Sequence, residues 1–269
     1  MYKYNGRVIH QSHDDDGIVE VVENDQVRSL HFGSIPRQSS MSLLYPDKLE
    51  LDYVRAMTLA YLFKPLAHDE MLIIGLGGGS LAKHVLQQYP DCRLTIIEQR
   101  QSVVTIAHQF FALPTDPRLT VIIDDAGRYL RLNTHTCSER FSLISIDAFD
   151  HEGLAASINN KAFLSACHKV LKHDGILVIN LWGGTSNPVF QQVALWLGQI
   201  FNWRILFLPV PGKGNIIGFA FNTGVVNYSF KALAEYAEQL AQRLHIDYPF
   251  YLKEIKRHNT STLKQIIRS

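Results

Sequence analysis

The sequence predicts an α/β protein built on a mostly parallel sheet with helices on both faces. Short runs rich in Ile, Leu and Val recur from residue 71 onward, and helical patterns separate most of them. Strands that alternate with helices in this way form βαβ units. The 269 residues, 46% hydrophobic and 19% charged, can form a sizeable core. We expect a small β-hairpin domain over residues 1–50 and a nucleoside-binding catalytic domain over residues 51–269.

The N-terminal segment predicts a hairpin followed by a helix. Apolar and polar residues alternate over Gly17–Gly33, and the polar tetrad Glu23–Gln26 interrupts the alternation, which is typical of two strands joined by a turn. Over Asp47–Leu66 the apolar residues follow helical spacing instead, and Pro65 ends that pattern. This helix should lead into the parallel sheet.

The rest of the chain predicts six strands with crossover helices, then a seventh strand. The seventh, Asn215–Asn222, follows the short connection Pro211–Gly214, which has no room for a crossover helix, so it should run antiparallel to the sixth. A helix over Phe230–Leu244 should close the fold. The first six strands are Met71–Gly75, Leu94–Glu98, Leu119–Ile123, Phe141–Asp147, Gly175–Trp182 and Trp203–Pro209, and the helices between them are Ser80–Tyr89, Ser102–Phe111, Asn160–Lys172 and Pro188–Phe201.

Composition and charge argue against several classes of protein. Lys and Arg total 26 against 25 for Asp and Glu, whereas a general nucleic-acid binder carries a concentrated basic excess. No apolar run is long enough to span a bilayer, and the N-terminus holds no signal-peptide core. We therefore expect a cytoplasmic protein without a nucleic-acid or membrane partner. Three cysteines without a CxxC pair and twelve histidines without ligand spacing predict no metal site.

A glycine-rich loop and the acidic residue after the next strand predict a nucleoside site. Ligands of open parallel sheets bind beyond the carboxyl ends of the strands. The first strand ends in a loop with four glycines: Gly75, Gly77, Gly78 and Gly79. Glycines permit a tight turn and aim the next helix N-terminus into the crevice. The second strand ends in Glu98, where a carboxylate can accept hydrogen bonds from both ribose hydroxyls.

Further carboxylates follow the third and fourth strands. Asp124 and Asp125 follow the third strand, with Ala126 next to them, and Asp147 and Asp150 follow the fourth. Repeated carboxylates suit a cationic sulfonium nucleoside of the S-adenosylmethionine type better than a pyrophosphate. Ser80, in place of the third glycine of a dinucleotide fingerprint, points the same way. Structural roles also stay open: Glu98 as a solvated strand end, Asp125 as a helix N-cap, and Asp147 and Asp150 as turn formers.

Several stretches of the chain resemble the spermidine synthase (polyamine aminopropyltransferase) family. They are Leu72–Leu81, Thr95–Glu98, Asp116–Val121, Ile146–Asp150 and Leu171–Leu177, with Val27–Leu30, Gln38–Ser39 and Tyr53 upstream. The resemblance covers nearly the whole chain. It implies a methyltransferase-type Rossmann fold with a small β-rich N-terminal domain, and a homodimer.

The resemblance also implies the reaction. A 3-aminopropyl group would pass from decarboxylated S-adenosylmethionine, a co-substrate, to an amine such as putrescine, without a metal. Glu98 would hold the ribose, Asp125 the adenine amino group, and Asp147 would orient and deprotonate the amine. The other residues implied to bind the amine are Asp150, Tyr53 and Gln38. The remaining cofactor-binding positions are the four loop glycines, Asp124 and Ala126.

Three departures from the family pattern concern the amine half of the site. Gly78 stands where family members carry an aspartate that contacts the aminopropyl amine, Tyr53–Arg55 replaces Tyr-x-Glu, and Pro211–Gly214 replaces a tyrosine-bearing loop. Arg55 and Lys213 would repel a diamine if they line its pocket. Two alternatives follow: methyl transfer from S-adenosylmethionine itself, and a non-catalytic nucleoside-binding homologue. The basic segment Lys253–Arg268 is interpreted as a solvated tail.

Overall fold

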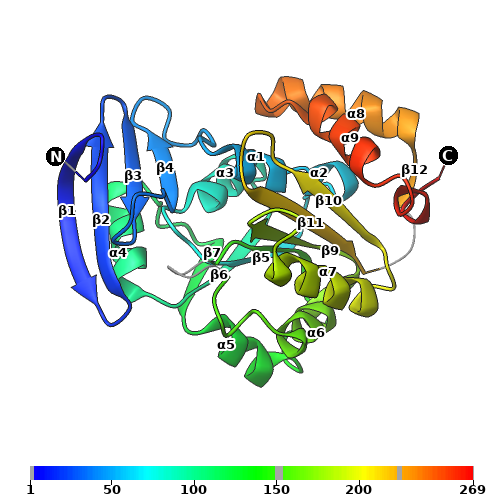
Figure 1. The fold of residues 1–269 in the computed structure, drawn as a ribbon, viewed down its shortest axis with the longest axis horizontal. Helices are drawn as coiled ribbons and strands as arrows, with labels where there is room; N and C mark the ends of the chain where they lie inside the picture. The colour runs from blue at the N-terminus through cyan, green and yellow to red at the C-terminus, as the bar shows by residue number, and fades with distance from the viewer. Residues whose placement is uncertain (1–2, 149–153, 223–225, 269) are drawn as a thin grey trace.

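The computed structural model describes residues 3–148, 154–222 and 226–268, and its two larger sheets lie side by side (Figure 1). The smaller of these is antiparallel, in the order β1-β2-β3-β4. The hairpin expected over Gly17–Gly33 is confirmed as β2 and β3, which pair up to Asn24 and Val27. A domain boundary at residue 50 stays a prediction. The strands are β1 Arg7–Asp14, β2 Gly17–Asn24, β3 Val27–His31 and β4 Ser39–Ser42.

The larger sheet has seven strands in the order β10-β11-β9-β8-β5-β6-β7. Strands β5 to β9 are parallel to one another, and β11 and β10 are antiparallel, as the short connection between them predicts. The strand order reverses at β5, so the carboxyl ends of β5 and β8 flank the crevice where such sheets bind ligands. The strands are β5 Glu70–Ile74, β6 Arg93–Glu98, β7 Leu119–Ile123, β8 Phe141–Ile146, β9 Leu171–Trp182, β10 Ile205–Pro209 and β11 Asn215–Phe221.

Helices cover both faces of this sheet because its strands are apolar on both sides. In β5, Met71 and Ile73 enter a core shared with α1 to α4, α8 and α9, whereas Leu72 and Ile74 enter a core shared with α5 to α7. The α/β class is confirmed. The helices are α1 Asp52–Met57, α2 Ala60–Phe63, α3 Ser80–Gln88, α4 Gln101–Phe110, α5 Ala126–Asn133, α6 Lys161–Val170, α7 Pro188–Ile200, α8 Phe230–Leu244 and α9 Tyr248–His258. The described elements also include a short strand pair, β12 Val226–Ser229 and β13 Ile267–Arg268, and the 3-10 turn Leu263–Gln265.

Two expectations from the sequence were wrong, one about a helix and one about the C-terminal segment. The helix expected over Asp47–Leu66 is two short helices, α1 and α2, because the hydroxyl of Thr58 bonds the carbonyl of Arg55 and a turn follows. The segment Lys253–Arg268 is not a solvated tail, because its first residues belong to α9, which buries Leu252 and Ile255 among the larger core. The apolar residues of α9 recur at helical spacing, so the sequence contained this signal.

The small sheet is held against the larger one by cationic side chains. Arg100, at the start of α4, reaches the tip of the β1–β2 hairpin, where its Nη2 lies 2.7 Å from Oδ1 of Asp14. Ser102 donates to the same carboxylate. Further along, Arg28 of β3 donates from Nη1 to the carbonyl of Phe110 at 2.6 Å. The hairpin tip is thereby fixed beside the carboxyl end of β6.

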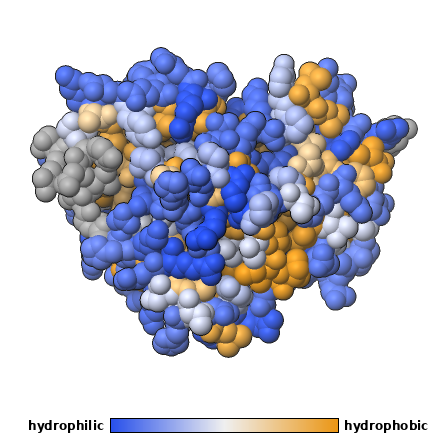
Figure 2. Space-filling model, turned by 180° about the vertical axis from the view of Figure 1, so that it is seen from behind, coloured by the Kyte–Doolittle hydropathy of each residue, from blue (hydrophilic) through white to orange (hydrophobic). Residues whose placement is uncertain are grey.

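The outer surface is mixed in character. Seen from behind, hydrophilic residues cover most of the molecule and hydrophobic residues gather in patches between them (Figure 2). Among the described residues, no helix combines the length and apolar character that crossing a membrane requires.

Candidate active site

The carboxyl ends of β5, β6 and β8 meet at the residues that the sequence singled out. The amide of Gly75 donates to the carbonyl of Ile97 at 2.9 Å, and the amide of Asp147 donates to the carbonyl of Ile74 at 2.9 Å. Gly75 has a φ of +89°, and a Cβ there would lie 2.3 Å from the carbonyl oxygen of Asp147. Only glycine therefore fits at this point, where the end of β5 passes the end of β8.

The glycine loop also packs tightly against the N-terminal sheet. The Cβ position of Gly77 lies 3.5 Å from the carbonyl oxygen of Gln38, so Gln38 borders the loop. A contact between Gln38 and the amine stays a prediction. A Cβ on Gly78 would lie 2.7 Å from Oγ of Ser39 and 2.8 Å from the ring of Phe111. An aspartate does not fit at Gly78 without displacing these side chains, which gives a packing reason for this departure from the family pattern. Gly79, with a φ of +73°, is the N-cap of α3.

Glu98 is buried, and backbone amides hold both of its carboxylate oxygens. Oε2 accepts from the amide of Leu76 at 2.8 Å, and Oε1 accepts from the amide of Arg100 at 2.9 Å. Burial raises the pKa of Glu98, and these two hydrogen bonds oppose the rise. Each oxygen keeps a second lone pair for a ligand hydroxyl. A merely solvated strand end is not what the structure shows.

The acidic residues after β7 have structural partners. Oδ1 of Asp125 accepts from the amide of Arg128 at 2.7 Å and caps α5, so the N-cap interpretation holds for that oxygen. Oδ1 of Asp124 pairs with Nε of Arg128 at 2.8 Å. Ala126 is buried in the first turn of α5, and a Cβ on Gly127 would lie 2.5 Å from the carbonyl of Ser157.

Asp147 lies on the sheet face that carries α1. Oδ1 of Asp147 accepts from Nδ2 of Asn180 in β9 at 2.9 Å, and Tyr53 in α1 lies next to the same carboxylate. Burial raises the pKa of Asp147, while Asn180 and Tyr53 oppose the rise. The pKa of Tyr53 lies well above its usual value, through burial and through the neighbouring carboxylate. The structure thus brings Tyr53 and Asp147 together, and the role of Tyr53 in binding the amine stays a prediction.

The sequence analysis missed Asn180, which hydrogen-bonds Asp147, and Trp182, which lies further along the same strand. Asn180 interrupts an otherwise apolar strand, and that interruption is a signal that could have identified it. Trp182 follows two residues later on the same face of β9, with 57% of its surface exposed. Its ring packs 3.1 Å from the Cβ position of Gly214. An exposed indole is a surface on which an alkylammonium can rest.

The two cations that cast doubt on the amine pocket have partners of their own. Arg55 donates from Nε to the carbonyl of Leu49 at 2.6 Å, and its Nη1 lies 3.4 Å from Oδ1 of Asp52. Nζ of Lys213 lies 3.9 Å from Oδ2 of the same aspartate. Asp52 thus reduces the positive field that Arg55 and Lys213 would exert on a cationic substrate.

The remaining predicted site residue, Asp150, lies outside the described residues. Among the residues that the structure describes, no group of three His, Cys, Asp or Glu side chains is arranged to hold a metal ion.

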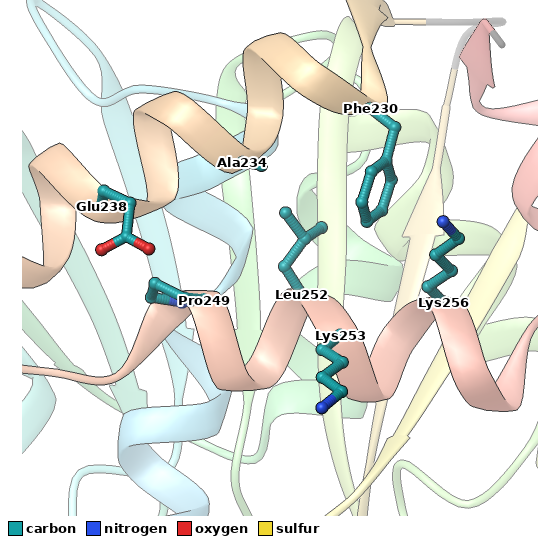
Figure 3. A pocket seen from close by; sticks show the side chains of 7 residues that line it. All are labelled: Phe230, Ala234, Glu238, Pro249, Leu252, Lys253 and Lys256. Atoms are coloured by element: carbon teal, nitrogen blue, oxygen red, sulfur yellow. The ribbon is translucent and has the colours of Figure 1, made fainter.

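A separate shallow pocket lies between α8 and α9 (Figure 3). Phe230 projects from α8 toward α9, and Nζ of Lys256 lies 4.3 Å from the centre of its ring. All of the lining residues come from these two helices: Phe230, Ala234, Glu238, Pro249, Leu252, Lys253 and Lys256. This pocket includes none of the strand-end residues described above.

Comparisons with known proteins agree on one group of enzymes. The family model for the spermine/spermidine synthase domain matches residues 53–195. A polyamine aminopropyltransferase of Neisseria meningitidis serogroup A is 32% identical over 247 residues, which cover 91% of this chain and 92% of the relative. One of Chromobacterium violaceum is 29% identical over 93% of both. A probable spermidine synthase structure from Corynebacterium glutamicum superimposes with a TM-score of 0.73 at 19% identity, covering 87% of this chain and 88% of that one.

Proposed function

Because the chain belongs to the spermine/spermidine synthase family, we propose that it transfers a 3-aminopropyl group from decarboxylated S-adenosylmethionine to an amine such as putrescine. The observation that carries the proposal is the Asp147 carboxylate at the switch point of the sheet, hydrogen-bonded by Asn180 and next to Tyr53. Two polyamine aminopropyltransferases that match this chain over 92% and 93% of their own length support the transferase class.

The proposed chemistry assigns Asp147 two tasks. An alkylammonium is not a nucleophile, so the amine must lose a proton before it attacks. The carboxylate attracts the cationic amine and accepts that proton. The amine nitrogen then forms a bond to the carbon next to sulfur, the carbon–sulfur bond breaks, and its electron pair stays on sulfur as neutral methylthioadenosine. Most of the acceleration comes from holding the two substrates in one crevice.

The nucleoside half of the site is assigned to the other strand ends. Glu98 offers the free lone pairs of both oxygens to the ribose hydroxyls. Oδ2 of Asp125 would accept from the adenine amino group, since Oδ1 caps α5. The backbone of Gly77 to Gly79, with Asp124 and Ala126, would complete the cradle. Asp150, Tyr53 and Gln38 are the proposed amine-side contacts.

One observation favours methyl transfer as a second candidate. The loop has no carboxylate at Gly78, and Ser39 and Phe111 fill the space where its side chain would begin. Intact S-adenosylmethionine carries a carboxylate that an aspartate there would repel. The retained Asp147 carboxylate favours aminopropyl transfer, because that reaction needs a site for a cationic acceptor.

Ligand titration tests the proposal. Calorimetry with decarboxylated S-adenosylmethionine, the intact compound and methylthioadenosine should show preference for the decarboxylated form. Putrescine turnover should fall about 100-fold or more in Asp147→Asn, with methylthioadenosine affinity unchanged. Asp174→Asn is the matched control, since Asp174 is an exposed aspartate that pairs with Lys64. Methyl transfer from the intact compound, or binding without turnover over a panel of amines, would refute the proposal.

We also propose a cytoplasmic homodimer that binds no nucleic acid. A near-neutral net charge of +1 supports the last point. Sedimentation velocity would report twice the 30.5 kDa chain mass for a dimer, and a single-chain mass would refute it.

A further inference from the structure

Two buried asparagines lead from β11 across β9 to the Asp147 carboxylate. Asn215 donates from Nδ2 to Oδ1 of Asn180 at 3.0 Å, and Asn180 donates from Nδ2 to Oδ1 of Asp147 at 2.9 Å. Both amides are buried. Because β8, β9 and β11 are neighbours in the sheet, the three side chains form one row on the same face.

The first bond fixes the direction of the second. An asparagine amide has a donor end and an acceptor end of nearly equal size, so packing alone does not choose between them. Asn215 supplies a donor to Oδ1 of Asn180, and this leaves the NH₂ group of Asn180 facing Asp147. In the opposite orientation, the oxygen of Asn180 would face a carboxylate oxygen and repel it.

A purely structural role does not account for these amides. On the same face of the sheet, Val178 of β9 and Ile217 of β11 are buried and apolar. A buried polar group loses its hydrogen bonds to water, and a net gain requires good partners inside the protein. The partner at the end of this row is a carboxylate at the candidate active site.

We infer that Asn180 and Asn215 are positioning residues: together they hold the Asp147 carboxylate ionised and oriented for the amine. The inference rests on the proposed function, because it explains how a partly buried carboxylate stays ready to accept a proton. Burial alone would favour the protonated form, which neither attracts an ammonium nor accepts its proton. Asn180 opposes this effect directly, and Asn215 acts through Asn180.

The other groups around Asp147 leave its titration readable. Among the described residues, the titratable side chain in contact with it is Tyr53 on α1, whose pKa lies far above the range in which a carboxylate titrates. Arg55 and Lys213 are paired with Asp52. Changes in the pKa of Asp147 can therefore be attributed to the amides.

The test is a carbon-13 NMR titration of the aspartate carboxyl groups, with the Asp147 signal assigned by its loss in Asp147→Asn. Removing one charge-assisted hydrogen bond in Asn180→Ala should raise the pKa of Asp147 by about one unit or more. Asn215→Ala should raise it by less. The double variant should titrate like Asn180→Ala alone, because Asn215 has no other route to the carboxylate.

Asn222→Ala is the matched control. Its amide bonds the carbonyls of Leu171 and Lys172 at the opposite end of β9, so it should leave the Asp147 titration unchanged. Methylthioadenosine affinity and melting temperature verify that each variant folds. An Asn215→Ala titration equal to the wild type, or shifts that add in the double variant, would overturn the inference.

Kinetics supply the second readout. If Asp147 must be ionised, the acid limb of the kcat/KM profile should move to higher pH in Asn180→Ala, and turnover should recover at high pH. A uniform loss at every pH would contradict a positioning role. If the wild-type chain transfers no aminopropyl group to any amine, the proposed function fails, and the NMR titration still decides the inference about the two asparagines.

Discussion

Replacing Gly75 with alanine should displace the Asp147 backbone. The left-handed backbone costs an L-residue roughly 1–2 kcal/mol. The new Cβ would also lie 2.3 Å from the carbonyl oxygen of Asp147 and 2.9 Å from its carbonyl carbon, and relieving such an overlap in a packed region costs about 1–3 kcal/mol. The sum, about 2–5 kcal/mol, corresponds to a melting temperature lower by about 5–15 °C. Because Asp147 must move, turnover should fall by about 100-fold.

Gly212→Ala separates the two contributions. Gly212 has a φ of +68°, and nothing lies within 4 Å of its Cβ position. It should therefore lose only the backbone part, a melting temperature lower by about 2–6 °C, and keep its turnover. Differential scanning calorimetry and a putrescine assay measure both quantities. Equal losses of stability in the two variants, or normal turnover in Gly75→Ala, would refute the reasoning.

Three further changes test other parts of the site. Glu98→Gln turns an NH₂ group toward the amide of Leu76 or of Arg100, so methylthioadenosine should dissociate about tenfold more readily in calorimetry; unchanged affinity would remove Glu98 from the site. Burial raises the pKa of Asp14, but the hydrogen bonds from Arg100, Ser102 and the amide of Asp16, with the charge of Arg100, together hold that pKa below its usual value. Asp14→Ala should therefore cost about 1–2 kcal/mol at neutral pH, a difference that should vanish in melts as the pH falls through that lowered pKa; a difference that persists there would contradict the ion pair. Trp182→Ala should raise KM for the amine about tenfold with kcat unchanged, and an unaltered KM would place the indole outside the pocket.

The sequence predicted the sheet and the strand-end residues because both depend on local signals. Apolar runs of five or six residues followed by glycine or a carboxylate place Gly75, Glu98 and Asp147 at one edge, whatever the details of packing. The helix after β7 was not predicted, because α5 is short and buries few apolar side chains, among them Ala126 and Leu130.

The partners of the carboxylates could not be predicted in this way. Asn180 lies 33 residues after Asp147 in the chain, and Asn215 lies 35 residues after Asn180. Their hydrogen bonds depend on which strands become neighbours, and on the switch to antiparallel pairing at β11. Likewise, the pairing of Asp124 with Arg128 follows from the pitch of α5, whose existence the sequence analysis had missed.

Asn259, directly after α9, determines what the outer strand of the larger sheet can do. Its Oδ1 accepts from the amide of Phe207 at 2.8 Å, and its Nδ2 donates to the carbonyl of Phe207 at 2.8 Å. One side chain thereby imitates an adjoining β-strand and occupies backbone groups that would otherwise recruit a foreign chain. A protein truncated before this asparagine should therefore become prone to aggregation through β10 before it loses its ligand crevice.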